Sequence, residues 1–192
     1  MTTWSDLQNE VYTLTKRPDL EGMTDIAIRS AILAAHKSGK YWKDLSIVAV
    51  DGLTQDTIQE IDIATRLPRF RQVAYIKDPV TELFYTPAEI GDLIDEWKTP
   101  RTDIYYGVGA KLLLRAYTPL TEYEVCYYLR PGATEADLAS WIVDEHPSVV
   151  TLFAASTLLS TIGEKEIKAQ VDQLVAIAIA DLQQDNIEII GR

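Results

Sequence analysis

The side chains that most often do chemistry are few in this chain and lie far apart in its sequence. The two histidines, His36 and His146, have no second histidine, cysteine or carboxylate at the spacing of a zinc-binding helix. The run Asp144-Glu145-His146 has residue types suited to acid–base catalysis, but it ends a predicted helix, where solvated polar residues are common. Cys126 lies in a predicted strand with no histidine nearby, which favours a buried, unreactive thiol over a nucleophile. We therefore expect no catalytic, metal or cofactor site, and a protein that is not an enzyme.

Three motifs could bind a ligand or a partner. Residues 107–111 read Gly-Val-Gly-Ala-Lys, but they lack the Gly-Lys-Ser/Thr ending of a phosphate loop and lie between predicted strands, so a hairpin turn is favoured. Arg66, Arg69 and Arg71 form a basic cluster around Pro68, which could contact a phosphate or a partner's carboxylate; the alternative is a solvated strand edge. A set of tyrosines could form a ligand platform, although tyrosine is also common in cross-strand pairs: Tyr105, Tyr106, Tyr117, Tyr123, Tyr127 and Tyr128.

The charge of the chain argues against nucleic-acid and membrane-surface partners. Its 192 residues include 18 Lys and Arg against 29 Asp and Glu, for a net charge of −11. An acidic chain is repelled by phosphate backbones and by anionic lipid headgroups. From Thr134 to the end there are ten acidic and three basic residues, so the C-terminal third is the acidic part.

Other sequence features predict a protein that stays in a reducing compartment. A single cysteine excludes an intramolecular disulfide and a cysteine-rich zinc cluster. The first ten residues lack the basic start and the apolar run of a signal peptide. No apolar stretch approaches the ~20 residues that a membrane-spanning helix needs. We expect a cytoplasmic site of synthesis and no membrane partner.

The apolar pattern changes from helical to alternating and back to helical, which predicts an α+β fold: a helical bundle with a β-rich insertion. Ser5 is expected to cap a first helix to about Leu14, and Thr24 a second helix to about Ser38. Residues 1–40 and 131–184 form the predicted helical body, 41–130 the β-rich insertion, and 185–192 a C-terminal tail.

Alternating apolar residues and turn motifs predict seven strands in the insertion. They lie near residues 46–50, 58–63, 71–77, 82–85, 103–107, 111–117 and 122–129. In the last of these, Tyr123, Val125 and Tyr127 share the more apolar face. The sequence Thr86-Pro87-Ala88-Glu89 is a capping box that predicts a short amphipathic helix over 87–97.

The C-terminal part of the body is predicted to be a helix followed by a helical hairpin. Thr134 is expected to cap a helix that Pro147 ends, and Pro147 then opens an apolar helix that should be buried. Gly163 ends that helix, and a short turn leads into a final helix with an apolar face directed at its neighbour.

Several short motifs follow one another in a recognisable order. They are YTLTKRPDL at 12–20, AHKS at 35–38, YWKDL at 41–45, LLL at 112–114, TP at 118–119, YY at 127–128, RP at 130–131, WI at 141–142, HP at 146–147 and GEKE at 163–166. In this order they resemble the head-to-tail adaptor, or head-completion, proteins of tailed bacteriophages. The resemblance spans nearly the whole chain, and its motifs are short and non-catalytic. The long β-rich middle departs from the simplest, all-helical members of that family.

The resemblance implies a structural virion protein at the head–tail junction. Such proteins form a homo-oligomeric ring, commonly twelvefold, beneath the portal of a filled capsid. They offer a platform to the next tail component, a stopper, tail tube or nozzle protein. Packaged DNA would pass through the ring without sequence-specific binding. The alternatives are a tail-completion or tail-terminator ring and, from a different class, an acidic inhibitor that mimics DNA, for which no regular carboxylate spacing is present.

Two hypotheses concern how such a ring would work. Ile187, Ile189 and Ile190 could dock onto the portal by strand addition or groove filling, or they could belong to a frayed terminus. The acidic C-terminal third could line the channel and keep DNA from adhering, or it could lie outside and aid solubility.

Overall fold

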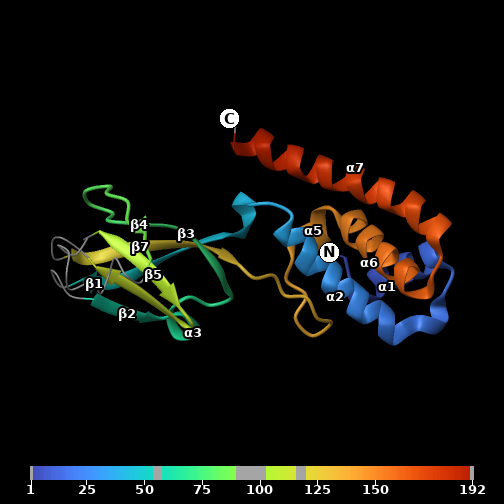
Figure 1. Ribbon diagram of the computed structural model, residues 1–192, viewed down its shortest axis with the longest axis horizontal. Helices are drawn as coiled ribbons and strands as arrows, with labels where there is room; N and C mark the ends of the chain where they lie inside the picture. Colours follow the sequence, from blue (N-terminus) through green and yellow to red (C-terminus); the bar gives the residue numbers. More distant parts are fainter. Residues whose placement is uncertain (1, 54–57, 90–102, 116–119, 191–192) are drawn as a thin grey trace. The chain divides into compact units, whose positions relative to one another are not determined.

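The computed structural model describes residues 2–53, 58–89, 103–115 and 120–190, and the fold is α+β as predicted (Figure 1). The chain divides into two compact units. Met1–Lys43 and Arg130–Arg192 form a helical unit, and Asp44–Leu129 form a β unit. Within the described residues, no helix combines the length and the apolar character that crossing a membrane requires.

The N-terminal helices of the helical unit begin earlier than predicted. Helix α1 spans Trp4–Thr15, and its cap is Thr3, whose hydroxyl accepts a hydrogen bond from the Asp6 amide at 3.2 Å. The Asp6 carboxylate in turn accepts from the Thr3 amide at 2.9 Å, which completes a capping box. A 3-10 turn, η1 (Pro18–Leu20), leads into α2 (Glu21–Lys37).

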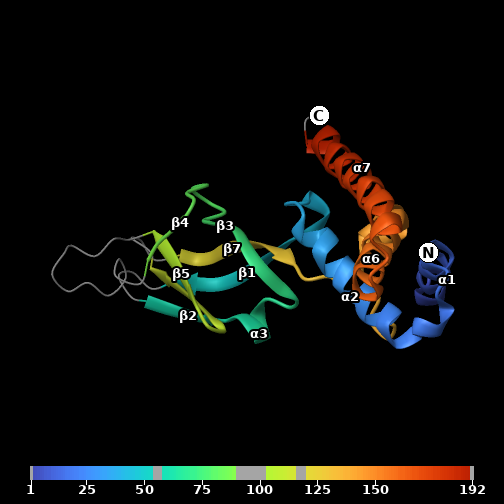
Figure 2. The same cartoon turned by 45° about the vertical axis from the view of Figure 1, so that its right-hand side comes forward.

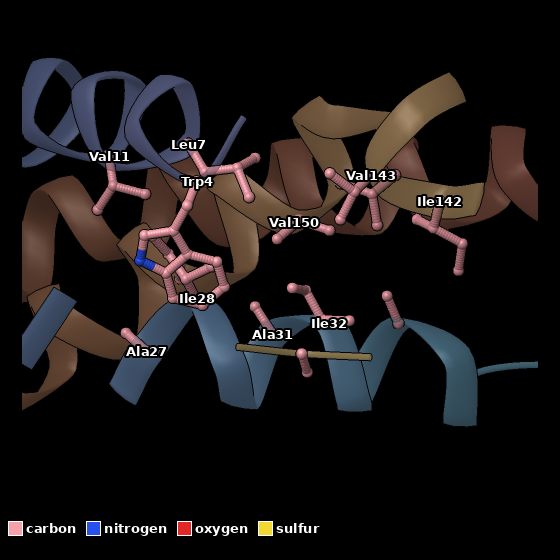
Figure 3. Close-up of a cluster of buried hydrophobic side chains, with 14 of the residues drawn as sticks. Trp4, Leu7, Val11, Ala27, Ile28, Ala31, Ile32, Ile142, Val143 and Val150 are labelled. Atoms are coloured by element: carbon pink, nitrogen blue, oxygen red, sulfur yellow. The ribbon is translucent and has the colours of Figure 1, made fainter. Parts of the chain in front are cut away.

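The rest of the helical unit consists of α5 (Trp141–Glu145), α6 (Pro147–Ile162) and α7 (Lys165–Ile190). Helix α6 is the buried helix that its apolar sequence predicts, and it lies between α2 and α7 (Figure 1). Gly163 ends α6 in the left-handed region, with φ of 83°, and the short turn makes α6 and α7 an antiparallel pair. Figure 3 shows Trp4 of α1 packed over Ile28 of α2 in the main core.

Two C-terminal predictions were wrong. Helix α5 begins at Trp141 and is capped by Ser140, because residues 132–139 form a tight hairpin in which Gly132 and Ala139 exchange backbone hydrogen bonds. The predicted tail, from residue 185, is helical as far as Ile190, since α7 continues through it. The Asn186 side chain of α7 accepts a hydrogen bond from the Trp42 amide at 3.2 Å, a contact that holds the end of the helix.

The β unit contains two sheets. In the first, β7 (Leu120–Leu129) lies between β1 (Leu45–Leu53) and β3 (Phe70–Lys77), antiparallel to both (Figure 2). The second has the order β2-β6-β5-β4, formed by Ile58–Asp62, Lys111–Arg115, Ile104–Val108 and Thr86–Pro87. A short helix, α3 (Ile63–Arg66), follows β2, and the 3-10 turn η2 (Trp42–Asp44) precedes β1.

The strand alternation predicted for β7 is confirmed. Tyr123, Val125 and Tyr127 are fully buried in the core of the β unit, where Leu112 and Leu114 of β6 also lie. Gly109, with φ of 57°, turns β5 into β6, so the glycine-rich motif is the predicted hairpin turn. Thr86 and Pro87, expected to open a helix over 87–97, form strand β4 instead; residues 90–97 lie outside the described part of the chain.

Candidate interaction surfaces

The three arginines of the basic cluster do not form one patch. Arg71 of β3 contacts Asp44 at 3.1 Å, both side chains being largely buried, and its guanidinium lies over the Tyr128 ring, 5.2 Å from the ring centroid. Arg66, at the end of α3, is exposed and lies 4.0 Å from a carboxylate oxygen of Asp51. Arg69 lies between α3 and β3 with a positive φ of 55°. Arg71 therefore supports the β unit and is not available to a phosphate in this structure.

The three C-terminal isoleucines have a helical backbone. Ile187, Ile189 and Ile190 belong to the last turn of α7, and their side chains lie outside the described residues. A helical backbone already uses its N–H and C=O groups within the helix. Docking of this segment by strand addition would therefore require it to leave the helix first, whereas groove filling would not.

The residues considered for chemistry have structural partners. His36 is buried, and its Nε2 lies 2.8 Å from the hydroxyl of Ser140, the residue that caps α5. His146 lies 3.6 Å from Asp185 of α7. Burial raises the pKa of the Cys126 thiol, which disfavours the reactive thiolate. Within the described ranges, no cluster of three or more His, Cys, Asp or Glu side chains is arranged to hold a metal ion.

The structure reveals an apolar loop that sequence patterns did not single out. Residues Asp78–Phe84, here called the 78–84 loop, connect β3 to β4 and expose three large apolar side chains: Val80, Leu83 and Phe84. Val80 is 83% exposed and Phe84 is 56% exposed, although Phe84 also packs edge-to-face on Tyr75. Large apolar side chains grouped at an exposed turn are typical of a contact with another protein.

A buried carboxylate holds this loop in one conformation. Asp78 is 4% exposed; it accepts hydrogen bonds from the Val80 amide at 2.8 Å and from the Thr81 hydroxyl. Its backbone amide donates to the Leu83 carbonyl at 2.9 Å, and its carbonyl accepts from the Glu82 amide at 3.0 Å. The loop is therefore ordered before any partner arrives, which lowers the entropic cost of binding.

We predict that the loop loosens in acid through Asp78. The hydrogen bond from the Thr81 hydroxyl, followed by the backbone amides, holds the pKa of Asp78 below its ordinary value. A depressed pKa means that the stabilisation is present above the unfolded-state pKa and is lost as the pH falls through the folded-state pKa. Hydrogen exchange of the 78–84 amides should therefore accelerate as the pH falls below about 4, the ordinary pKa of an aspartate, beyond the intrinsic pH dependence of exchange.

The matched variant is Asp78→Asn, which keeps the size of the side chain and removes its charge. Its loop should exchange faster than wild type at neutral pH and should lack the acid-dependent step. An equal pH profile in the two proteins would show that Asp78 does not hold the loop.

The helical unit carries an open pocket of about 220 Å³ beside α2. Its apolar lining includes Trp4, Ile26 and Ala133, and its polar lining includes Asp25, Arg29 and Glu135. Trp4 and Gln8 both donate hydrogen bonds to Asp25 at 2.8 Å, which fixes one wall. The pocket is shallow, and its apolar residues suit a side chain of another protein better than a charged small molecule.

A scan of protein-family models and a search of curated proteins both found nothing that matches this chain.

Proposed function

We propose that this chain is a structural subunit of the head-to-tail connector of a tailed bacteriophage. In this proposal it forms a homo-oligomeric ring, with twelve copies as the expected number, that joins the portal of the capsid to the next tail component and continues the DNA channel. It acts in the virion, after synthesis in the host cytoplasm, and it needs no cofactor.

The observation that carries the proposal is the grouping of exposed apolar side chains on separate surfaces. The β unit exposes Val80, Leu83 and Phe84 on one loop. The helical unit exposes Ile26 on α2 and, on α7, Leu174 and Ile177. A subunit of a cyclic ring needs at least two different surfaces for its two neighbours and further surfaces for the components above and below it. Separate apolar surfaces on both units suit that role.

The order of the segments adds support from the sequence. The described motifs that resemble head-to-tail adaptors fall in α1, η1, α2, η2, β6, β7, α5 and the α6–α7 hairpin, so both units carry some of them. The motif at 118–119 lies outside the described residues. The acidic C-terminal third maps largely to α7 and the segments before α6. Carboxylates on a channel wall would repel the passing DNA backbone, which is the role the proposal gives them if α7 faces the channel.

The test is to mix the pure protein with the portal protein of the same phage and to image the product by electron microscopy. We expect rings of this protein stacked coaxially on the portal, and cosedimentation of the two proteins. Cosedimentation with the tail tube protein but not with the portal would replace the proposal by the tail-completion or tail-terminator alternative. A protein that associates with neither component, and never with itself, would contradict both.

A further inference from the structure

Helix α7 exposes an apolar stripe that ends in carboxylates. Ile167, Leu174 and Ile177 recur at helical spacing and are exposed, with Leu174 49% and Ile177 58% accessible. From residue 173 to residue 180 the helix has no charged side chain. The same stripe continues to Asp181 and Asp185, seven and eleven residues after Leu174. We call these residues the α7 face.

Helix α2 exposes a stripe of the same length that ends in cations. Ile26 is 71% exposed and lines the pocket beside Trp4. Leu33 and Lys37 follow Ile26 at helical spacing, again seven and eleven residues on. Leu33 is half-buried against the main core, and Lys37 is exposed. Arg29 lies one turn after Ile26 and also lines the pocket. We call Ile26, Arg29, Leu33 and Lys37 the α2 face.

These two faces cannot meet within one copy of the chain. Both belong to the helical unit, where α6 lies between α2 and α7 and contacts each of them through its own buried face (Figure 1). The exposed side chains Ile26 of α2 and Leu174 and Ile177 of α7 therefore belong to separate surfaces of the helical unit. Among the described residues, Arg29, Lys37 and Asp181 have no ion-pair partner in the same copy, while Asp185 has only the contact with His146.

We propose that the α7 face of one copy packs on the α2 face of the next copy, with the two helices parallel and with Leu174 or Ile177 inserted into the pocket beside Trp4. This inference rests on the ring proposed above and assigns its subunit interface. A contact between two different faces of the same chain is heterologous, so it adds copies in one direction until a ring closes.

Charge selects the second copy as the occupant and sets the direction of the helices. In a net acidic chain, two copies repel each other over most of their surface. Residues 173–180 of the α7 face carry no charge, and Lys37 of the α2 face is a cation that can pair with a carboxylate at the end of the α7 face of the next copy. In the parallel arrangement, Ile26 lies against Leu174, and the equal spacing brings Lys37 against Asp185. In the antiparallel arrangement with Ile26 on Leu174, Asp181 and Asp185 would lie beyond the first residue of α2, Glu21, and neither would meet Lys37.

The interface can be tested by disulfide trapping between two single variants, Ile26→Cys and Leu174→Cys, mixed in equal amounts under mild oxidation. The native Cys126 is buried and serves as the wild-type background. We expect a mixed dimer that forms at least ~10-fold faster than either homodimer, both with and without the portal. The matched control is Ala176→Cys, which is exposed on α7 but lies on the opposite side of the helix from Ile167.

A charge swap gives a second, independent readout. Asp185→Lys should weaken self-association measured by sedimentation by roughly 3-fold, the effect of a rim ion pair, and Lys37→Glu should do the same. The double variant, Asp185→Lys with Lys37→Glu, should recover wild-type association, because each copy then offers a swapped pair to its neighbours. Neither substitution lies in a core, so each variant should fold.

The outcomes separate this inference from the proposed function. In one outcome, rings form on the portal, but Ile26→Cys and Leu174→Cys form a disulfide no faster than the Ala176→Cys control. That outcome would overturn the interface and leave the ring in place. Trapping and charge-swap rescue without portal binding would support the interface and overturn the connector function. If the double variant associates more weakly than either charge variant, because the two losses of self-association add, the interface is also overturned.

Discussion

Replacing Gly132 by alanine should destabilise the helical unit by about 2–4 kcal/mol, because its backbone leaves no space for a side chain. A Cβ atom at this position would lie 2.4 Å from the carbonyl oxygen of Asp137 and 2.8 Å from the amide nitrogen of Ala139. Both are backbone atoms of the 132–139 hairpin, so neither can rotate away. The Gly132 amide also donates to the Ala139 carbonyl at 2.9 Å, and the clash would break this contact.

The consequence should spread beyond the hairpin. Ala133 is part of the main core, and Ser140, which follows the hairpin, caps α5. The measurement is urea denaturation followed by circular dichroism at 222 nm, where the midpoint should fall. The control is Gly22→Ala in α2, where a Cβ would meet nothing within 4 Å, and alanine should stabilise the helix by about 0.5–1 kcal/mol. Equal midpoints for Gly132→Ala and wild type would contradict the hairpin geometry.

The same hairpin explains why the start of α5 was mispredicted. A threonine hydroxyl that accepts from the amide three residues later is the signature of a helix N-cap. Thr134 makes that bond, accepting from the Asp137 amide at 3.2 Å, but it does so at the tip of a hairpin. The local sequence therefore predicts this hydrogen bond but does not distinguish a helix N-cap from a hairpin. The two backbone hydrogen bonds between Gly132 and Ala139 make the segment a hairpin.

The C-terminal end of α7 could not be assigned from its own sequence. Alternating isoleucines after residue 186 are typical of a strand or a tail. The helix continues because Asn186 and Gln183 reach the segment after α2: the Gln183 side chain donates to the Ser38 carbonyl at 3.1 Å. Contacts between residues about 145 positions apart leave no trace in a local pattern.

Most of the helices, most of the strand positions and the burial of α6 followed from periodicity, whereas the strand predicted at 82–85 and the surfaces did not. Only the structure shows that Asp78 is buried and that Val80 is exposed. The sequence signal for this surface was the presence of three large apolar residues, Val80, Leu83 and Phe84, within one loop. Likewise, proximity in sequence grouped Arg71 with Arg66, and the structure assigns Arg71 to Asp44.

That assignment leads to the second large effect. Replacing Asp44 by alanine should destabilise the β unit by about 3 kcal/mol, because removal of one partner of a buried ion pair leaves the other charge desolvated. Asp44 is 3% exposed, and the Arg71 side chain that it contacts is 16% exposed and lies over the Tyr128 ring. Hydrogen exchange of the β7 amides is the measurement, since β7 pairs with β3, the strand that carries Arg71.

The double variant Asp44→Ala with Arg71→Met separates a buried charge from lost packing. Methionine keeps much of the aliphatic length of arginine and removes its charge, so the double variant should recover most of the protection lost in Asp44→Ala alone. The exposed pair supplies the control: Asp51→Ala removes the partner of Arg66 and should change stability by less than about 0.5 kcal/mol. If the losses of protection from Asp44→Ala and from Arg71→Met simply add in the double variant, the two charges are not coupled to each other. Arg71 could then leave Asp44 for a partner's carboxylate without losing the energy of an ion pair.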